Sequence, residues 1–429
     1  MSRPTWTSER GFIIATLAAT IGLGNIWRFP YLVGVQGGGA FILAYLLAIV
    51  LVGIPLMIME FALGRRTRGS TVRVFQRLHP RAGVFGWLVI ALTGIIMSYY
   101  LVITGWTLAY LGASLTGSLV PFATFASGYG SLYYFVACTL LAGWILSRGL
   151  AALERFSRSL MPALYLLVLA MAAYGLTLPG SQKAFAFLFH WDLSTLKDMN
   201  IWLVALGQAF YSLGVGQGSL VTYGSYMPAG ASLQRSAVLI TGLETAMSLL
   251  SGLIIFPVVF TFGLPPDSGS NLAFNTLPVV FRSMPGGNIL AVMFFGLLFL
   301  SALSASIGGM KVVADPISER FDLTPKRAAW TVAVILLVLG TPSALSFTPI
   351  QLSIAGQPFL EFVDHTFASQ VLVVSALIGT ALISWLLPPR RLIAKLKTRW
   401  LVEAYAMVFI ARCLPLVVLF GLLVTALLP

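Results

Sequence analysis

The stretch GFIIATLAATIGLGNIWRFPYLVGV, residues 11–35, has the apolar length of a membrane-spanning helix, about 20 residues, but glycine interrupts its middle. The interruption is GLGN at residues 22–25. A second apolar stretch, residues 202–223, contains GVGQG at residues 214–218. Because glycine costs a helix about 1 kcal/mol per site relative to alanine, both segments are expected to unwind. For either cluster alone, close helix packing through small residues is the competing interpretation.

The two interrupted stretches occupy corresponding positions if the chain repeats a five-helix unit with inverted topology. Paired glycine-interrupted segments of this kind point to a binding site near the middle of the membrane. Unwound backbone is tolerated there only where a ligand, an ion or cavity water satisfies its N–H and C=O groups. N–H groups at the start of a half-helix suit a carboxylate, and free carbonyls suit a hard cation. The breaks therefore predict a site for an amino acid and a cation.

The composition of the whole chain indicates a membrane protein. Among its 429 residues, 58% are hydrophobic and 9% are charged, whereas a soluble domain has roughly 25% charged residues. So few charges cannot cover the surface of a soluble protein of this size. We therefore expect an all-α polytopic membrane protein with eleven transmembrane helices. The predicted spans are 11–35, 39–63, 84–115, 133–146, 160–178, 202–223, 237–262, 289–314, 328–345, 359–387 and 404–428.

The distribution of Lys and Arg predicts the orientation of the chain. With the N-terminus inside, the inner segments carry 21 of the 26 basic residues and the outer segments carry three. We expect a cytoplasmic N-terminus and an extracytoplasmic C-terminus in a plasma membrane, as in a bacterial inner membrane. No cleavable signal peptide is expected, because the first apolar run is too long. Topology also accounts for the net charge of +13, so no nucleic-acid partner is expected.

Acidic residues inside the predicted spans mark candidate functional positions, because burying a charge there is costly. Glu60 lies in the second span and Glu244 in the seventh. Glu244 is too deep in its span to reach the interface, so its carboxylate needs a cation or a proton. The cysteines, Cys138 and Cys413, have no paired spacing that would suggest a disulfide or a metal site.

Five stretches carry a resemblance to a known family. They are GLGNIWRFPYLVGVQGGGAFILAYLLAIVLVGIPLMIMEFALGR (22–65), SYYLVITGWTL (98–108), GQAFYSLGVGQG (207–218), GSNLAFNTLPVVF (269–281) and EFVDHTF (361–367). In these stretches the chain closely resembles the neurotransmitter:sodium symporter family, in its bacterial, leucine-transporter-like form. The resemblance implies one transmembrane domain over residues 1–429, a 5+5 inverted repeat, and discontinuous helices 1 and 6. The first repeat would cover about 11–178, the second about 202–387, and an extra helix about 404–428.

By this resemblance, the carboxylate of the substrate meets the backbone N–H groups of Leu23 and Gly24 and the hydroxyl of Tyr100. Family members that carry amines have an aspartate at the position of Gly22. The glycine leaves room for the carboxylate of the substrate itself, which favours an amino acid over a monoamine.

The resemblance also implies the side-chain pocket. Its remaining residues are Ala19, Ile96, Tyr211, Gly214, Gln217, Ala305 and Gly309. Gly214 and Gly309 are expected to make room for a sizeable side chain. Gln217 stands where the family usually has phenylalanine, and its amide is expected either to hydrogen-bond a polar substrate or to line water.

The first sodium site is implied to use the carbonyl of Thr20, the side chains of Asn25 and Ser212, and the carboxylate of the substrate. At the position of Glu244 the family often has asparagine, with a serine four residues later that helps to bind chloride. This chain has Glu244 and Ser248 there. We expect the Glu244 carboxylate to replace chloride and to ligate sodium, so no chloride requirement is expected.

The second sodium site is implied to use the carbonyls of Ala18, Ile21 and Ser301 and the hydroxyl of Ser304. The family usually supplies another hydroxyl where this chain has Ala305. Losing one oxygen weakens a sodium site unless water replaces it. The sequence therefore leaves one sodium ion or two as alternatives.

Two gates are implied as well. The outer gate consists of Arg28, Gln208 and Asp364. The inner gate consists of Arg3, Trp6, Tyr226 and Glu319. Glu60 resembles a buried glutamate that holds the unwound backbone of the sixth span. Lys311 and Asp315, one helical turn apart, are expected to form a local ion pair.

The resemblance implies a symporter that uses a sodium gradient to import a neutral L-amino acid by alternating access, without covalent chemistry. The expected partners are the amino acid and the lipid bilayer. Competing interpretations are a substrate-binding sensor or a weakly coupled channel-like protein on the same fold. A carrier of an amine or osmolyte is disfavoured by Gly22. The identity of the amino acid and the oligomeric state stay open.

Overall fold

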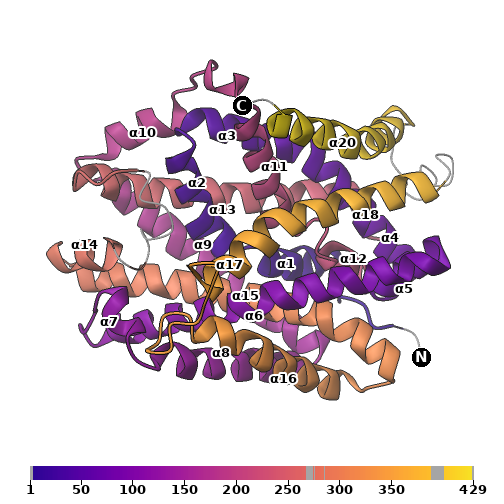
Figure 1. Ribbon diagram of the computed structural model, residues 1–429, viewed down its shortest axis with the longest axis horizontal. Coiled ribbons are helices and arrows are strands. Elements are labelled where there is room, and N and C mark those ends of the chain that lie inside the picture. Colours follow the sequence, from indigo (N-terminus) through magenta and orange to yellow (C-terminus); the bar gives the residue numbers. More distant parts are fainter. Residues whose placement is uncertain (1–2, 267–273, 275, 285, 388–400, 428–429) are drawn as a thin grey trace.

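The computed structural model describes residues 3–266, 274, 276–284, 286–387 and 401–427. The basic inner loop predicted at residues 390–399 and the motif residues 269–273 lie outside this part of the chain. Helices make up nearly all of the described structure (Figure 1). Eight of them are long and apolar enough to cross a membrane, and a bent pair makes a ninth. These spans are Gly39–Thr67, Pro80–Leu115, Gly130–Ser147, Leu150–Leu176, Leu233–Thr261, Gly287–Phe321, Pro325–Ala344 and Phe359–Leu386, with the pair Glu9–Thr20 and Gly24–Val35.

The elements follow one another in a single order along the chain. They are α1 (Glu9–Thr20), η1 (Gly24–Arg28), α2 (Phe29–Val35), α3 (Gly39–Ala48), η2 (Ile49–Gly53), α4 (Ile54–Thr67), α5 (Thr71–Leu78), η3 (Pro80–Ala82), α6 (Gly83–Leu115), α7 (Phe122–Ala126), α8 (Gly130–Ser147), α9 (Leu150–Leu176), α10 (Ser181–Phe189), η4 (Thr195–Lys197), α11 (Met199–Leu213), α12 (Ser219–Ser225), α13 (Leu233–Thr261), α14 (Leu277–Ser283), α15 (Gly287–Phe321), α16 (Pro325–Ala344), β1 (Ser353–Ile354), β2 (Gln357–Pro358), α17 (Phe359–Val363), η6 (Asp364–Val371), α18 (Leu372–Leu386) and α20 (Leu401–Leu427). The two short strands pair antiparallel.

Side-chain caps define where several helices begin. A side-chain oxygen at the N-cap accepts a hydrogen bond from a backbone N–H of the first turn, which satisfies a donor that has no partner within the helix. The capping residues are Ser8 for α1, Ser70 for α5, Asp198 for α11, Ser232 for α13 and Thr324 for α16. Serine, threonine and aspartate at these positions explain why the helices begin there.

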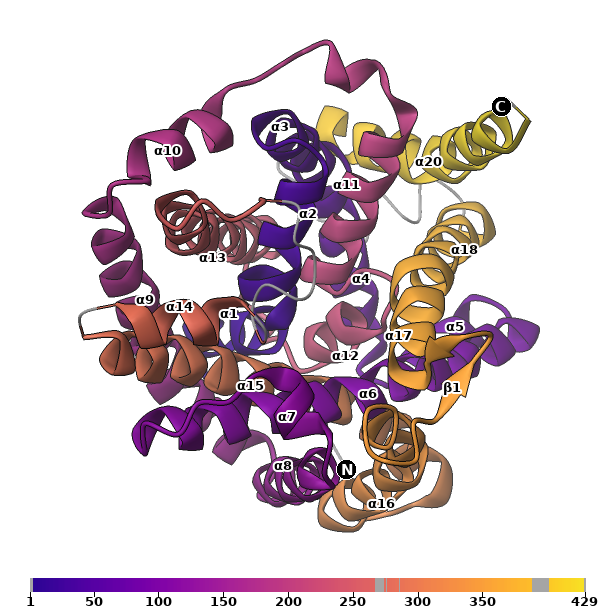
Figure 2. The same cartoon turned by 60° about the vertical axis from the view of Figure 1, so that its left-hand side comes forward.

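The first predicted break is confirmed. α1 ends at Thr20, Ile21 adopts an extended conformation, and the chain resumes as the π-helical turn η1 before α2. The axes of α1 and of the segment that follows differ by 57°. Figure 2 shows α1, α2 and α12 in the interior of the molecule, surrounded by other helices. The unwound residues therefore lie deep inside the protein.

The second predicted break is also confirmed. α11 ends at Leu213 and α12 begins at Ser219, and the glycines between them, Gly214, Gly216 and Gly218, have φ values of 71°, 75° and 75°. Glycine adopts this conformation without the steric cost that a side chain adds. Close packing applies here too, because a Cβ on Gly216 would lie 2.5 Å from the Cα of Ala376. Unwinding and close packing thus require the same glycine.

Span boundaries differ from the sequence prediction most at the fifth span, which begins at Leu150 and not at residue 160. The added turns contain Glu154 and Arg158, which form an ion pair within the helix. Glu154 also accepts a hydrogen bond from the N–H of Thr7, 3.0 Å away. The helix therefore continues beyond its apolar part and holds the N-terminal segment.

The conformation of Gly216 yields a test. We expect Gly216→Ala to lower the free energy of unfolding by about 1–3 kcal/mol, because the positive φ is strained for alanine and its Cβ meets α18. The matched control is Gly242→Ala in α13, where a Cβ would meet nothing within 4 Å. Thermal unfolding in detergent measures both variants. Equal melting temperatures for the two variants would contradict the requirement for glycine at position 216.

Candidate functional site

A small cavity of about 50 Å³ lies between the two breaks. It brings together most of the residues predicted for substrate binding. Its lining consists of Ala19, Thr20, Gly22, Gly24, Ile96, Met97, Tyr100, Tyr211, Ser212, Gly214, Gln217, Ser219, Ala305 and Gly309. Leu23, also predicted for substrate binding, lines a wider neighbouring cavity, while its N–H points to Tyr100. The residues predicted for the substrate pocket therefore lie together in the structure.

Backbone groups released by the first break are bound by side chains from elsewhere. The N–H of Leu23 donates to the hydroxyl of Tyr100 at 2.9 Å. The amide of Gln208 donates to the carbonyl of Gly24, also at 2.9 Å. A Cβ on Gly22 would lie 2.4 Å from the Tyr100 hydroxyl, so this wall has no room for a larger residue. A ligand carboxylate here would replace the Tyr100 hydroxyl as the acceptor of the hydrogen bond from the Leu23 N–H.

Two side chains, Met97 and Ser219, lie against the glycines that the sequence predicts to make room for the substrate. A Cβ on Gly309 would lie 2.1 Å from the sulfur of Met97, so the methionine occupies that space. Gly214 faces Ser219, whose Cβ would be 3.3 Å from a Cβ on the glycine. Both glycines line the small cavity, and the expectation that they make room for a sizeable side chain stays a prediction. Met97 and Ser219 were missed because no pattern along the chain shows which side chain fills the space above a glycine.

Gln217 lies at the edge of the same cavity. Its amide nitrogen donates to the carbonyl of Tyr211 at 3.4 Å, and the side chain is buried. The Gln217 backbone carbonyl accepts from the hydroxyl of Thr93 at 2.8 Å. The glutamine thus holds the unwound segment together in this conformation.

At the predicted first sodium site, Asn25 contacts the fully buried Glu244, while Thr20 and Ser212 line the small cavity. Asn25 donates through its side-chain nitrogen to Glu244, and also to the Ser248 hydroxyl at 2.9 Å. The Ser212 hydroxyl lies 3.1 Å from that of Tyr45. The second carboxylate oxygen of Glu244 is buried and has no hydrogen-bond partner within the described chain. A buried oxygen without a partner is costly unless something binds it, and a cation satisfies a carboxylate best.

The residues predicted for the second sodium site are buried and partly in contact. The Ser304 hydroxyl donates to the carbonyl of Ala18 at 2.5 Å, and the Ser301 hydroxyl donates within its own helix. Ser306 does not replace the hydroxyl missing at Ala305, because it lies 3.2 Å from the Thr104 hydroxyl. Ile21 is buried at the extended position between α1 and η1.

The predicted outer gate is not closed as an ion pair. Arg28 and Asp364 line a wide cavity of about 1220 Å³, and within the described residues no ion pair joins them. Arg28 lies over the Tyr211 ring and donates to Ser369, while Tyr99 donates to Asp364. Gln208 donates to the backbone carbonyl of Gly24 and not to Asp364. Arg28 and Asp364 thus line the same cavity without a direct ion pair, and their role as an outer gate stays a prediction.

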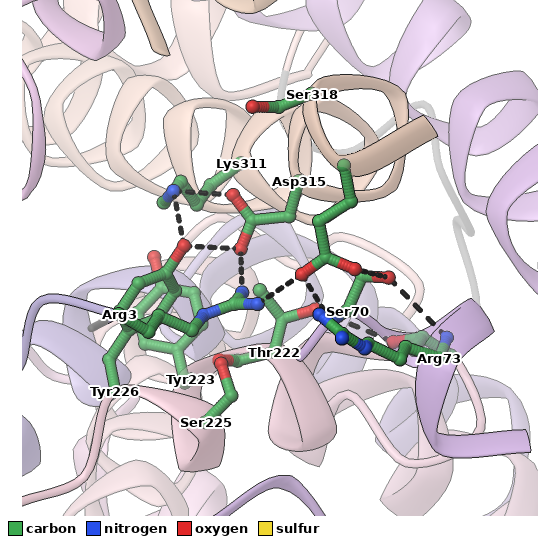
Figure 3. A network of polar contacts seen from close by, with 12 residues as sticks. Arg3, Ser70, Arg73, Thr222, Tyr223, Ser225, Tyr226, Lys311, Asp315 and Ser318 are labelled. Atoms are coloured by element: carbon green, nitrogen blue, oxygen red, sulfur yellow. Dashed lines mark hydrogen bonds and ion pairs between the residues drawn. The ribbon is translucent and has the colours of Figure 1, made fainter. Parts of the chain in front are cut away.

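The residues predicted for the inner gate are in contact, and Asp315 is at the centre of their contacts (Figure 3). Asp315 accepts hydrogen bonds from Arg3 at 2.6 Å, from Lys311 at 2.5 Å and from the Tyr226 hydroxyl at 2.6 Å. Arg3 also pairs with Glu319. The local Lys311–Asp315 pair is confirmed, but the sequence prediction missed that Asp315 also receives Arg3.

Further contacts complete this inner network. Glu319 accepts from the N–H and the hydroxyl of Ser70, at 2.8 and 2.7 Å. The backbone N–H of Trp6 donates to the carbonyl of Tyr226 at 2.9 Å. Ion pairs thus hold the inner network together. The wide cavity and the small cavity adjoin, because Tyr100 and Tyr211 line both.

Comparisons with known proteins explain this arrangement. A family model described as the sodium:neurotransmitter symporter family matches residues 3–132 and 130–428. The chain belongs to this family. It is therefore a transporter and not an enzyme, and its family uses sodium. The apolar helices agree with a multi-pass membrane protein.

Individual relatives of this transporter support the assignment. The sodium-dependent transporter YhdH of Bacillus subtilis (strain 168) is 34% identical over 402 residues, covering 89% of this chain and 87% of the relative. The sodium-dependent neutral amino acid transporter B(0)AT3 of Mus musculus is 26% identical, covering 87% and 76%. The crystal structure of MhsT in complex with L-phenylalanine has a TM-score of 0.88 and 36% identity, covering 98% of this chain and 99% of MhsT.

The inner network yields a second test. We expect Asp315→Asn to destabilise the protein by roughly 3 kcal/mol, because Lys311 loses its carboxylate and Arg3 keeps only Glu319. Asp322→Asn is the control: Asp322 is exposed, and asparagine tolerates its left-handed backbone. Melting temperatures in detergent measure the effect. If both variants melt together, Asp315 does not hold the network.

Proposed function

We propose that this protein imports a neutral L-amino acid together with sodium by alternating access. The observation that carries the proposal is the first break. The N–H of Leu23 donates to the hydroxyl of Tyr100, which lines the small cavity. Asn25 contacts the buried Glu244 carboxylate. One broken segment thus offers a donor to an anion at Leu23 and, two residues later, a contact from Asn25 to an acidic site for a cation. The likeness to MhsT, whose crystal structure contains L-phenylalanine, supports an amino acid as substrate.

The proposed membrane arrangement has eleven helices in one domain. Residues 1–429 would form a 5+5 inverted repeat, about 11–178 and 202–387, followed by a helix at about 404–428. The matching breaks α1/α2 and α11/α12 support the repeat, because each interrupts the first helix of its half. The excess of Lys and Arg in alternate connections supports a cytoplasmic N-terminus in the plasma membrane.

Substrate size in this proposal depends on Met97. The cavity of about 50 Å³ holds little more than a water molecule or two while Met97 fills the space beside Gly309. Methionine is unbranched and adapts its shape readily. Moving its thioether away from Gly309 enlarges the pocket toward a bulky side chain. Gly22 contributes no carboxylate, which favours an amino acid over an amine.

The proposed ion sites follow from oxygen atoms around the breaks. At the first site, Thr20, Asn25, Ser212 and Glu244 hold sodium, and the Glu244 carboxylate supplies the negative charge without chloride. At the second, Ala18, Ile21, Ser301 and Ser304 offer oxygens, and Ala305 offers none. This difference favours a strong first site and a weaker second one, so sodium binds as one ion or two.

In the proposed cycle, the structure represents the state open on the side of Arg28 and Asp364. Substrate and sodium enter through the wide cavity, which leads to Tyr211 and Tyr100. Arg28 and Asp364 then approach and close that side. Separation of Arg3 from Asp315 and Glu319 opens the other side, where water stabilises the separated charges.

Purified protein in liposomes tests the function. We expect an inward sodium gradient to drive accumulation of neutral amino acids, and replacement of sodium by potassium to abolish it. Competition by amino acids of increasing size measures the pocket, and the sodium dependence of the rate gives a Hill coefficient near one for a single ion. Substrate binding without accumulation would indicate a sensor, and accumulation of an amine or osmolyte would contradict the substrate class.

The role of Glu244 is tested separately. In chloride-free medium we expect Glu244→Gln to lower sodium-driven uptake about tenfold or more, because the amide cannot balance the charge of the ion. Added chloride is expected to restore part of the uptake. Asp322→Asn serves as the control for the loss of an exposed carboxylate. Full uptake by Glu244→Gln without chloride would show that Glu244 does not replace the anion.

A further inference from the structure

A third cavity, of about 610 Å³, lies beside the inner network, and two residues of that network, Ser70 and Glu319, line part of it. It is bounded by α5, the first turns of α6 and the last turn of α15, and it shares no residue with the other two cavities. Its polar lining includes Arg73, Gln76, Trp87, Glu319 and Arg320. We call it the basic cavity. The transport cycle described above uses Glu319 of this wall but neither of its two arginines.

Two positive charges in the basic cavity are uncompensated. Among the described residues, neither Arg73 nor Arg320 takes part in an ion pair. The acid on the cavity wall, Glu319, is engaged by Arg3 and by Ser70. In the neighbouring inner network, the positive charges of Arg3 and Lys311 balance the negative charges of Asp315 and Glu319. This network therefore has no excess negative charge to neutralise the two arginines of the cavity. The cavity therefore suits an anion.

The surroundings of the basic cavity are apolar and exposed. Val84 and Leu88, on the turns of α6 that flank Trp87, are 67% and 61% exposed, and Phe321, next to Arg320, is 66% exposed. α5 is amphipathic: it buries Val72 and Phe75 and exposes its arginines. Tryptophan and arginine beside exposed apolar side chains are typical of the boundary between lipid headgroups and acyl chains.

We propose that the basic cavity binds the phosphate headgroup of an anionic membrane phospholipid. Arg73 and Arg320 contact the phosphate, since guanidinium groups bind phosphate oxygens in pairs. Gln76 and the indole N–H of Trp87 offer further donors to the headgroup. The acyl chains lie along the exposed side chains of Val84, Leu88 and Phe321. This apolar surface distinguishes a lipid from free phosphate, which would gain nothing from it.

Native mass spectrometry of the detergent-purified full chain tests the proposal, with phosphatidylglycerol as the probe. We expect the wild type to retain one phosphatidylglycerol more tightly than phosphatidylcholine. The double variant Arg73→Gln, Arg320→Gln should raise the apparent Kd for phosphatidylglycerol about tenfold or more. The matched control is Arg66→Gln with Arg327→Gln, which removes two exposed arginines outside the cavity. It should leave the Kd unchanged.

Two outcomes would overturn the proposal. Equal loss of lipid in the cavity variant and the control variant would show that general charge, not this cavity, attracts the lipid. Inorganic phosphate that raises the melting temperature of the wild type, but not of the cavity variant, without any retained lipid would assign the site to a soluble anion. The melting temperature of each variant without lipid confirms that it folds. Since the readout is lipid binding, its result is independent of the transport assay.

Discussion

The structure depends on satisfying backbone groups where two helices are broken deep inside the protein. Each break releases N–H and C=O groups that neither lipid nor the helix itself can bind. Side chains from distant segments take their place: Glu60 accepts from the N–H of Gly216 at 3.0 Å, and Gln208 donates to the carbonyl of Gly24. The same segments are thereby left accessible to a ligand. The backbone groups that need hydrogen-bond partners for stability are thus the same groups that can bind a ligand.

This dual use explains why the buried polar residues cluster near the breaks. Asn25 lies in η1, directly after the unwound residues. Its side-chain oxygen accepts from the N–H of Gly22 at 3.1 Å, and its nitrogen donates to Glu244 and Ser248. A substitution at Asn25 would therefore disturb the backbone and the candidate ion site together. Effects on stability and on transport cannot be separated at such a position, whereas Glu244 contacts the break only through its carboxylate.

Much of this could be predicted from the sequence, because the signals were local. Glycine clusters mark the breaks, and a carboxylate in an apolar run, Glu60 or Glu244, marks a position that needs a partner. What could not be predicted depends on packing between distant segments. Met97 fills the space beside Gly309 because α6 and α15 lie together, and Asp315 joins Arg3 across the fold. The Arg28–Asp364 contact was predicted for a closed state, and the sequence does not choose between states.

The inner network has an electrical consequence. Arg3 and Lys311 carry two positive charges and Asp315 and Glu319 two negative ones, so the cluster as a whole is neutral. In the proposed cycle its opening does little net work against the membrane potential, which is worth about 2.3 kcal/mol per elementary charge at 100 mV. A neutral amino acid is zwitterionic and adds no net charge either. The voltage across the membrane would then act on the sodium ions alone. The number of charges moved per substrate molecule would equal the number of sodium ions transported with it.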